Sequence, residues 1–387
     1  MATLVKRLMV ERGRWAAALV GSPPLFFLVA LLMAAVLAPA ADGQPLVPAV
    51  IVFGDSVADS GNNNGRLTIF KADFPPYGRD FPGHTPTGRF CNGKLVTDIT
   101  VETLGFAAYP PAYLGPNATG KNLLIGANFA SGASGYLGST AILYVRAGFE
   151  FETYSSWYKN AVSLKQQLSY YKEYQQKVEK IAGNKTTSDS IFSGGVHILS
   201  AGTSDFLQNY YINPVYYLIY TPAQFADLLV GSFTSFVQDL YRLGARKIGV
   251  ASLPPMGCLP AAITLFGKGG NECVKRLNGD ALVFNRKLNA TAGQLKKKLA
   301  GLKLVVLDIY KPLLDLVDNP AGNGFFEARK ACCGTGTIET SLLCNAKSPG
   351  TCKNATGYVF WDSVHPSEAA NQVLANALLV QAIDLLS

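Results

Sequence analysis

Short apolar runs alternate with longer amphipathic stretches through most of the chain. Four of the runs are rich in valine, isoleucine and leucine and show little alternation with polar residues, which is typical of strands buried on both faces. We expect strands at residues 49–54, 196–202, 247–252 and 302–309. Because helical patterns lie between them, the sequence predicts an α/β fold with a mostly parallel sheet that helices cover on both faces.

Helix-end signals accompany the amphipathic stretches. Thr221, Pro222 and Gln224 supply a capping residue, a proline at the first helical position and a glutamine at the third. Gly244 ends that pattern. Three further helices are expected at residues 163–183, at residues 274–300 and from Pro366 to the C-terminus. Residues 74–111 are rich in proline and glycine and predict loops.

The first 43 residues have the pattern of a secretory signal peptide. Basic residues from Lys6 to Arg14 precede an apolar stretch that ends in Ala38-Pro39-Ala40. Its uninterrupted part has about 14 residues, fewer than the roughly 20 that a membrane anchor needs. We therefore expect a secreted protein whose mature chain, residues 44–387, contains no linker or repeat and forms a single domain.

Cysteine usage agrees with an oxidising compartment. The chain has seven cysteines, and four of them crowd into about 20 residues near the C-terminus: Cys332, Cys333, Cys344 and Cys352. Zinc ligands usually come as spaced Cys-x-x-Cys or Cys/His pairs, so disulfides are favoured over a metal site. We expect bridges among these four with their pairing left open, a further bridge between Cys258 and Cys273, and a free thiol at Cys91.

Glycosylation sequons and the distribution of charge limit the kinds of partner that the protein can bind. Asn-x-Thr sequons, which predict glycosylation of a secreted chain, occur at Asn117, Asn184, Asn289 and Asn354. The formal net charge of +8 is mild for 387 residues. The basic residues are scattered apart from Lys296–Lys298, which argues against nucleic-acid binding.

A polar, glycine-rich segment follows the first expected strand directly and begins Gly54-Asp55-Ser56. In open α/β sheets, ligands bind at the carboxyl ends of the strands. Small Gly54 permits a sharp turn, and a helix starting after Ser56 would aim its backbone N–H groups at any group bonded to the serine oxygen. Ser56 is therefore a candidate nucleophile, although a serine at such a junction is more often only a helix cap.

A nucleophilic serine needs a base, and the chain has only three histidines. His84 lies in an expected loop and His197 within an expected buried strand. His365 follows Asp362 by three residues and precedes Pro366. That spacing can bring a carboxylate to the imidazole, where it fixes the tautomer and stabilises the imidazolium. The alternative is that Asp362 only caps the last helix.

The residues around Ser56 and His365, with four further stretches between them, resemble the plant-type GDSL esterase/lipase family of the SGNH hydrolases. The resemblance covers nearly all of the mature chain. The matching stretches, in order, are FGDSVADSGNNN, PTGRFCNGKLVTD, GANFASGASGY, LSAGTSDFLQNYY, LPPMGC and VFWDSVHPSEAAN. The resemblance implies a flavodoxin-like three-layer α/β/α fold and hydrolysis of carboxylic esters through an acyl-enzyme. We expect no cofactor and no metal, and a monomer located in the apoplast or cell wall.

Residue roles follow from the same resemblance. Ser56 would be the nucleophile, His365 the base and Asp362 the acid that orients it. The backbone N–H groups of Ser56 and Gly132 would donate to the oxyanion. The family's third donor is normally an asparagine, for which this chain has Ser204, whose hydroxyl is shorter than an asparagine side chain.

Two alternative functions stay open at this point. An extracellular acyltransferase would pass the same acyl group to an alcohol or a sugar hydroxyl. A catalytically silent wall-binding glycoprotein would keep the fold, and the serine at position 204 is what raises this possibility. The sequence leaves the ester itself open among triacylglycerols, cutin-like polyesters, acetylated polysaccharides and phenolic esters.

Overall fold

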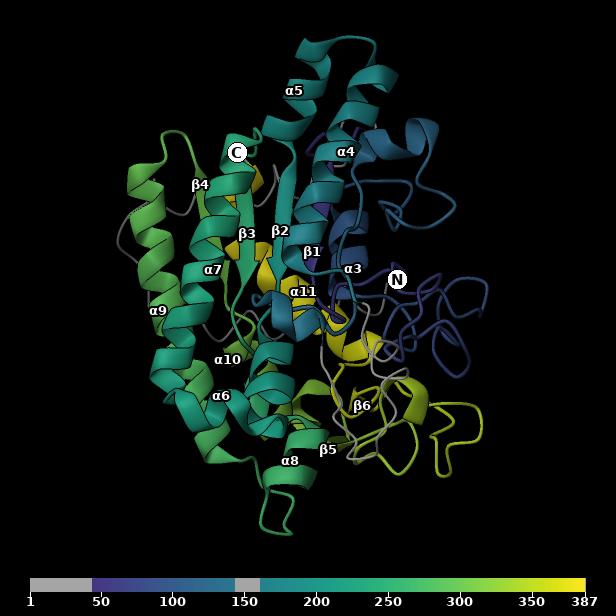
Figure 1. Ribbon diagram of the computed structural model, residues 1–387. Coiled ribbons are helices and arrows are strands. Elements are labelled where there is room, and N and C mark those ends of the chain that lie inside the picture. Colours follow the sequence, from purple (N-terminus) through teal and green to yellow (C-terminus); the bar gives the residue numbers. More distant parts are fainter. Residues whose placement is uncertain (1–43, 143–160, 387) are drawn as a thin grey trace, which may run out of the picture. The chain divides into compact units, whose positions relative to one another are not determined.

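Four parallel strands form the central sheet of the computed structural model, which describes residues 44–142 and 161–386. They lie side by side in chain order (Figure 1): β1 (Val50–Gly54), β2 (Val196–Ser200), β3 (Lys247–Ala251) and β4 (Lys303–Leu307). Each strand lies within its expected range, and the predicted α/β class with a mostly parallel sheet is confirmed. Residues 127–129 flank β1 on its other side, where Val52 N donates to Ala127 O and Phe129 N to Val52 O.

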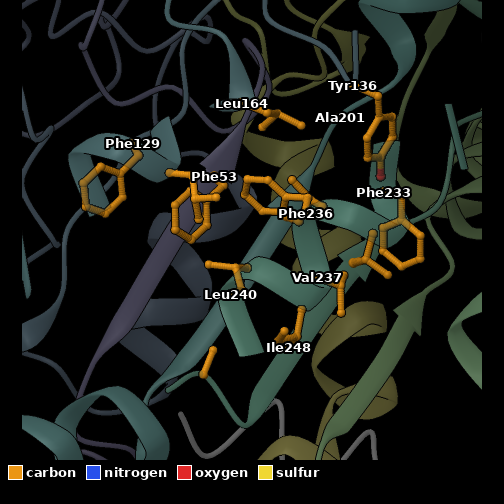
Figure 2. Close-up of a cluster of buried hydrophobic side chains, with 14 of the residues drawn as sticks. Phe53, Phe129, Tyr136, Leu164, Ala201, Phe233, Phe236, Val237, Leu240 and Ile248 are labelled. Atoms are coloured by element: carbon orange, nitrogen blue, oxygen red, sulfur yellow. The ribbon is translucent and has the colours of Figure 1, made fainter. Parts of the chain in front are cut away.

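Helices cover both faces of this sheet. One layer consists of α4 (Leu164–Ala182), α7 (Pro222–Arg242) and α9 (Lys275–Lys298). The other consists of α3 (Val96–Thr103), α11 (Glu368–Gln381) and α12 (Ile383–Leu386). Figure 2 shows part of the core on this side of the sheet, where Phe53 of β1, Ile248 of β3 and Phe236 of α7 belong to one cluster of buried side chains.

Shorter elements complete the described part of the chain. The helices are α5 (Lys185–Gly194), α6 (Pro214–Ile219), α8 (Pro260–Phe266) and α10 (Tyr310–Asp318), with a π-helical segment at Asp205–Ile212. Short 3₁₀ turns occupy Gly120–Ile125, Gly138–Ala141, Met256–Cys258, Ala321–Asn323 and Ser341–Leu343. A second, two-stranded parallel sheet pairs β5 (Glu327–Ala331) with β6 (Tyr358–Phe360). The strand β6 leads directly into the segment that contains Asp362 and His365.

The helix-end signals act as expected. Thr221 and Gln224 form a capping box at the start of α7, and Pro222 occupies the first helical position. Gly183 ends α4 in the left-handed conformation. These contacts are local, so the sequence alone could identify them.

The segment 74–111 is rich in loops, as expected, and it also contains α3, whose first turn is held by a hydrogen bond from Leu95 N to the Asp98 carboxylate. One expectation about a helix needs correction. The helix expected after Pro366 is two helices, α11 and α12, which meet at Ala382. Helices as short as α3 and α12 give little periodicity to detect in a sequence.

Three disulfides join six of the seven cysteines. The bridge between Cys258 and Cys273 is confirmed, and Cys91 is free and buried, as expected. The bridges left open from the sequence are Cys332–Cys352 and Cys333–Cys344. They restrain the segment that carries Thr340 and Ser341, both of which reach the candidate site described below.

The expected signal peptide, residues 1–43, lies outside the described residues. Within residues 44–142 and 161–386, no helix is long and apolar enough to cross a bilayer. All four sequon asparagines are exposed: Asn117, Asn184, Asn289 and Asn354.

Candidate active site

Ser56 lies in a turn at the carboxyl end of β1. Gly54 has φ of 141°, and a Cβ there would lie 1.9 Å from the Ser200 carbonyl oxygen of β2, so only glycine fits this close approach. The helix expected to start after Ser56 is absent. The chain instead forms successive turns in which Asp59 accepts hydrogen bonds from the amides of Gly61 and Asn62, each at 2.8 Å. Local side-chain hydrogen bonds of this kind compete with helix formation.

The fold brings Ser56, His365 and Asp362 together across 309 residues of sequence. Ser56 Oγ lies 2.7 Å from His365 Nε2, and His365 Nδ1 lies 2.8 Å from both carboxylate oxygens of Asp362. An ionised carboxylate only accepts hydrogen bonds, so Nδ1 carries the proton. Nε2 is then free to accept the proton of the Ser56 hydroxyl.

Asp362 is held by donors on several sides. Its carboxylate accepts hydrogen bonds from Tyr77 Oη at 2.7 Å, Thr340 Oγ1 at 2.9 Å and the amides of Val364 and His365 at 2.9 and 2.8 Å. Burial alone would raise the pKa of Asp362, but His365 and these donors outweigh it and hold the pKa below its ordinary value. The carboxylate is thus ionised in the folded protein.

Asp362 is not the cap of the last helix. Ser367 has that role, because its side chain accepts a hydrogen bond from Ala370 N at the start of α11. The alternative interpretation of Asp362 is therefore wrong for α11. Asp362 instead accepts from the two amides of the turn that precedes the helix.

The Gly132 amide points away from a role in binding an oxyanion. It donates to Asp59 Oδ2 at 2.8 Å, which differs from the expectation that it faces substrate. The next residue, Ala133, has φ of 66° and lines the same cavity as Ser56. Within the described residues the amides of Ser56 and Ala133 have no hydrogen-bond partner, so both can donate to a ligand. No signal in a single sequence tells which amide of this loop turns toward the cavity.

Ser204 is the residue expected to supply a third donor. It precedes the π-helical segment, is buried, and lines the cavity with Ser56. Its hydroxyl has no protein partner in the part of the chain that the structure describes. Asp205 anchors this loop by accepting from the amides of Tyr136 and Leu137, at 2.7 and 3.1 Å.

Three further buried carboxyl groups, those of Asp55, Asp59 and Asp205, belong to the segments around the site. Burial raises the pKa of Asp55 to about 7 and the pKa of Asp59 and Asp205 to about 6. These groups ionise less readily than Asp362. Among these four carboxyl groups, the one that neighbours His365 therefore ionises at the lowest pH.

The cavity over Ser56 has a volume of about 390 Å³. Its wall combines the candidate groups with apolar side chains from the π-helical segment and from α8, including Leu207, Ala262 and Phe266. Ile212, Leu265 and Leu343 reach it and are exposed. Such a wall suits an uncharged organic substrate.

The other two histidines lie elsewhere. His84 is exposed, and its Nδ1 lies 2.8 Å from Arg79 O. His197 is buried in β2 with its Nε2 2.8 Å from Tyr171 Oη, as expected for a structural histidine. No group of three or more histidine, cysteine or acidic residues in the described ranges could hold a metal ion.

Comparison of the sequence with known proteins identifies the family of this chain. The family model described as GDSL-like lipase/acylhydrolase matches residues 50–378. The chain belongs to the GDSL esterase/lipase family. A GDSL esterase/lipase of Arabidopsis thaliana is 61% identical over 347 residues, which are 89% of this chain and 94% of that protein. The GDSL esterase/lipase APG of the same plant is 60% identical over 342 residues, 88% of this chain and 92% of the relative. This chain is a carboxylic ester hydrolase.

Replacing Tyr77 by phenylalanine should destabilise this esterase measurably. The Tyr77 hydroxyl donates to Asp362 and accepts from Ser341 N, both at 2.7 Å, so its loss leaves a buried amide unpaired. We expect the free energy of unfolding in urea to fall by about 1–3 kcal/mol. Tyr310→Phe is the control, since that hydroxyl has no hydrogen-bond partner among the described residues. A loss at Tyr77 below about 0.5 kcal/mol would contradict the network.

Replacing Ser204 by alanine tests the third donor. If the hydroxyl donates to the developing oxyanion, kcat should fall by about tenfold or more while KM changes little. Ser204→Asn keeps a donor in place and should retain more activity than Ser204→Ala. An alanine variant with the parent's kcat would remove Ser204 from the oxyanion site.

Proposed function

We propose that this esterase acts through an acyl-enzyme formed on Ser56. The observation that carries the proposal is the distance of 2.7 Å between Ser56 Oγ and His365 Nε2, with Asp362 on the opposite ring nitrogen. A serine hydroxyl becomes an effective nucleophile when an oriented base takes its proton. The ionised Asp362 supplies that orientation and stabilises the imidazolium.

In acylation, Ser56 Oγ forms a bond to the ester carbonyl carbon and its proton passes to His365 Nε2. The carbonyl oxygen becomes negatively charged, and it accepts hydrogen bonds from the amides of Ser56 and Ala133 and from the Ser204 hydroxyl, all three residues lining the cavity. The bond to the alcohol oxygen then breaks, and the imidazolium gives that oxygen its proton. The products are an alcohol and an acyl group on Ser56.

In deacylation, a water molecule attacks the acyl carbonyl carbon and gives a proton to His365 Nε2. The bond to Ser56 Oγ breaks, and the proton returns to that oxygen. One ester and one water thus become one carboxylic acid and one alcohol, and the enzyme regains its first state. The cavity of about 390 Å³ leaves room for the water after the alcohol departs.

A fluorophosphonate probe tests the acyl-enzyme directly, because it phosphonylates nucleophilic serines. We expect mass spectrometry of the purified protein to find the adduct on the peptide that contains Ser56, with hydrolysis of p-nitrophenyl butyrate lost in proportion to labelling. Full activity after stoichiometric labelling of Ser56, or an adduct on another serine alone, would overturn the proposal.

We also propose that the protein is secreted as a glycoprotein with residues 44–387 as its single mature domain. The leader pattern, the three disulfides and the four exposed sequons support this. Protein collected from the medium of expressing plant cells should begin near residue 44 and lose apparent mass on treatment with a glycosidase. Retention of residues 1–43 on the exported protein would contradict cleavage.

A further inference from the structure

A second cavity, of about 140 Å³, lies between the central sheet and the helix layer of α3, α11 and α12. Along β2 it contacts Val196, Ile198 and Ser200, which share one face of the strand because side chains alternate. These residues are the first, third and fifth of the strand. Five residues of a strand extend over about 13 to 17 Å, so the cavity is elongated along β2.

Small residues of the neighbouring strand also line this space, although Leu307 and Leu385 pack closely against Gly249, within 3.1 and 3.2 Å of where a Cβ would lie. On β3 the cavity is lined by Gly249 and Ala251, whereas the intervening Val250 faces the opposite core cluster. Ile198 and Ala251 lie in the two inner strands, yet both are only half-buried. Strands covered by helices on both faces are normally buried throughout. Their exposure to an internal space indicates that this helix layer does not fill the surface of the sheet.

The second cavity adjoins the cavity over Ser56. The two share the wall residues Val57, Phe90, Thr203, Val364 and His365. Val57 follows Ser56 directly, and the ring of Phe90 lies 5.1 Å from the imidazole of His365. An ester carbonyl at Ser56 therefore lies at the boundary of the two spaces.

The residues that line the second cavity indicate which kind of ligand it can bind. The residues that line it include no aspartate, glutamate, lysine or arginine, and most are aliphatic. An apolar cavity of about 150 Å³ stays dry and can hold a benzene molecule, which has six carbons. A cavity of about 140 Å³ thus suits a flexible hydrocarbon chain of similar carbon count. Only a minority of the lining residues carry a hydroxyl or amide group, Thr100 and Ser200 among them, so most hydroxyl groups of a sugar or an acetylated glycan would have no partner there.

We propose that this second cavity binds the acyl chain of the ester, so that the enzyme prefers esters of medium-chain fatty acids, about six to eight carbons, over acetyl esters. The inference rests on the proposed acyl-enzyme at Ser56. The acyl chain lies between the sheet and α11, and the alcohol portion occupies the larger cavity beside α8. This division assigns one space to each half of the substrate.

A series of p-nitrophenyl esters from acetyl to dodecanoyl tests the proposal with the purified protein. Each buried methylene can improve kcat/KM by up to about fourfold, so activity should rise toward hexanoyl or octanoyl and then fall. An acetyl optimum, or a flat profile through dodecanoyl, would overturn the assignment. Either outcome would leave the acyl-enzyme intact as long as Ser56 is labelled by the fluorophosphonate probe, so the two failures are distinguishable.

Two variants should move the optimum in opposite directions. Ala251→Leu fills the cavity and should lower the ratio of octanoyl to butanoyl kcat/KM at least tenfold, whereas Leu379→Ala enlarges it and should shift the optimum to longer chains. Leu282→Ala is the control, because Leu282 is exposed on α9 in the opposite layer. An unchanged profile in Leu379→Ala contradicts the proposal even if Ala251→Leu does not fold.

Discussion

Replacing Ser56 by alanine is expected to lower kcat/KM for p-nitrophenyl butyrate by about 10⁴- to 10⁶-fold. Alanine has no oxygen to form the acyl-enzyme, and His365 Nε2, 2.7 Å from Ser56 Oγ in the parent, loses its reaction partner. The proposed oxyanion donors and the cavity over Ser56 remain, so a small rate above that of water should persist. Initial rates at several substrate concentrations give the comparison.

Ser60 supplies a matched control within the same turn segment. It is buried, and its hydroxyl has no hydrogen-bond partner among the described residues. Ser60→Ala should therefore keep kcat/KM within about threefold of the parent, as a substitution that removes no contact. If Ser56→Ala keeps more than a tenth of the parent's activity while its fold is intact, Ser56 is not the nucleophile.

The catalytic candidates could be found from sequence because each has a local signature. Ser56 follows a buried strand and a glycine, and Asp362 and His365 lie three residues apart before a helix-starting segment. These patterns give the position of each group relative to its own backbone. The sequence did not give the distance across 309 residues, which depends on how β1 and the segment after β6 meet.

The residues that support the site could not be predicted from the sequence, because their contacts join segments that are far apart along the chain. Tyr77 lies in a segment predicted to be rich in loops, and it reaches Asp362 across 285 residues. The Gly132 amide was assigned to the oxyanion, yet its partner Asp59 lies 73 residues away and turns it elsewhere. A hydrogen bond of this kind leaves no periodicity along the chain.

The second cavity illustrates a different limit. Gly249 and Ala251 read from the sequence as ordinary members of a buried strand. Whether small residues leave a space depends on the side chains that face them from the helix layer. Many of these side chains come from α11 and α12, near the C-terminus of the chain. Strand patterns predict which side chains face inward, but they do not predict how completely the facing layer fills the space.

Asp362→Asn is the second substitution with a large expected effect. It tests the orientation of the His365 imidazole separately from the nucleophilicity of Ser56. We expect kcat to fall by about 10⁴-fold with little change in KM. An asparagine amide can donate to His365 Nδ1, which leaves the proton on Nε2. The imidazole then presents a donor to Ser56 and cannot accept its proton, although Ser56 and the substrate cavities are unchanged.

The surroundings of Asp362 sharpen this test. Tyr77 and Thr340 both donate to Oδ2, while the amides of Val364 and His365 donate to Oδ1. An asparagine must place its NH₂ group against one of these pairs of donors, so some loss of stability should accompany the loss of rate. Asp308→Asn, at an exposed carboxylate that accepts from Tyr310 N, is the control for removing a negative charge. An Asp362→Asn variant that keeps the parent's kcat would mean that the tautomer of His365 does not depend on this carboxylate. The proposed role of Asp362 would then be wrong, whereas the proposed role of Ser56 would be unaffected.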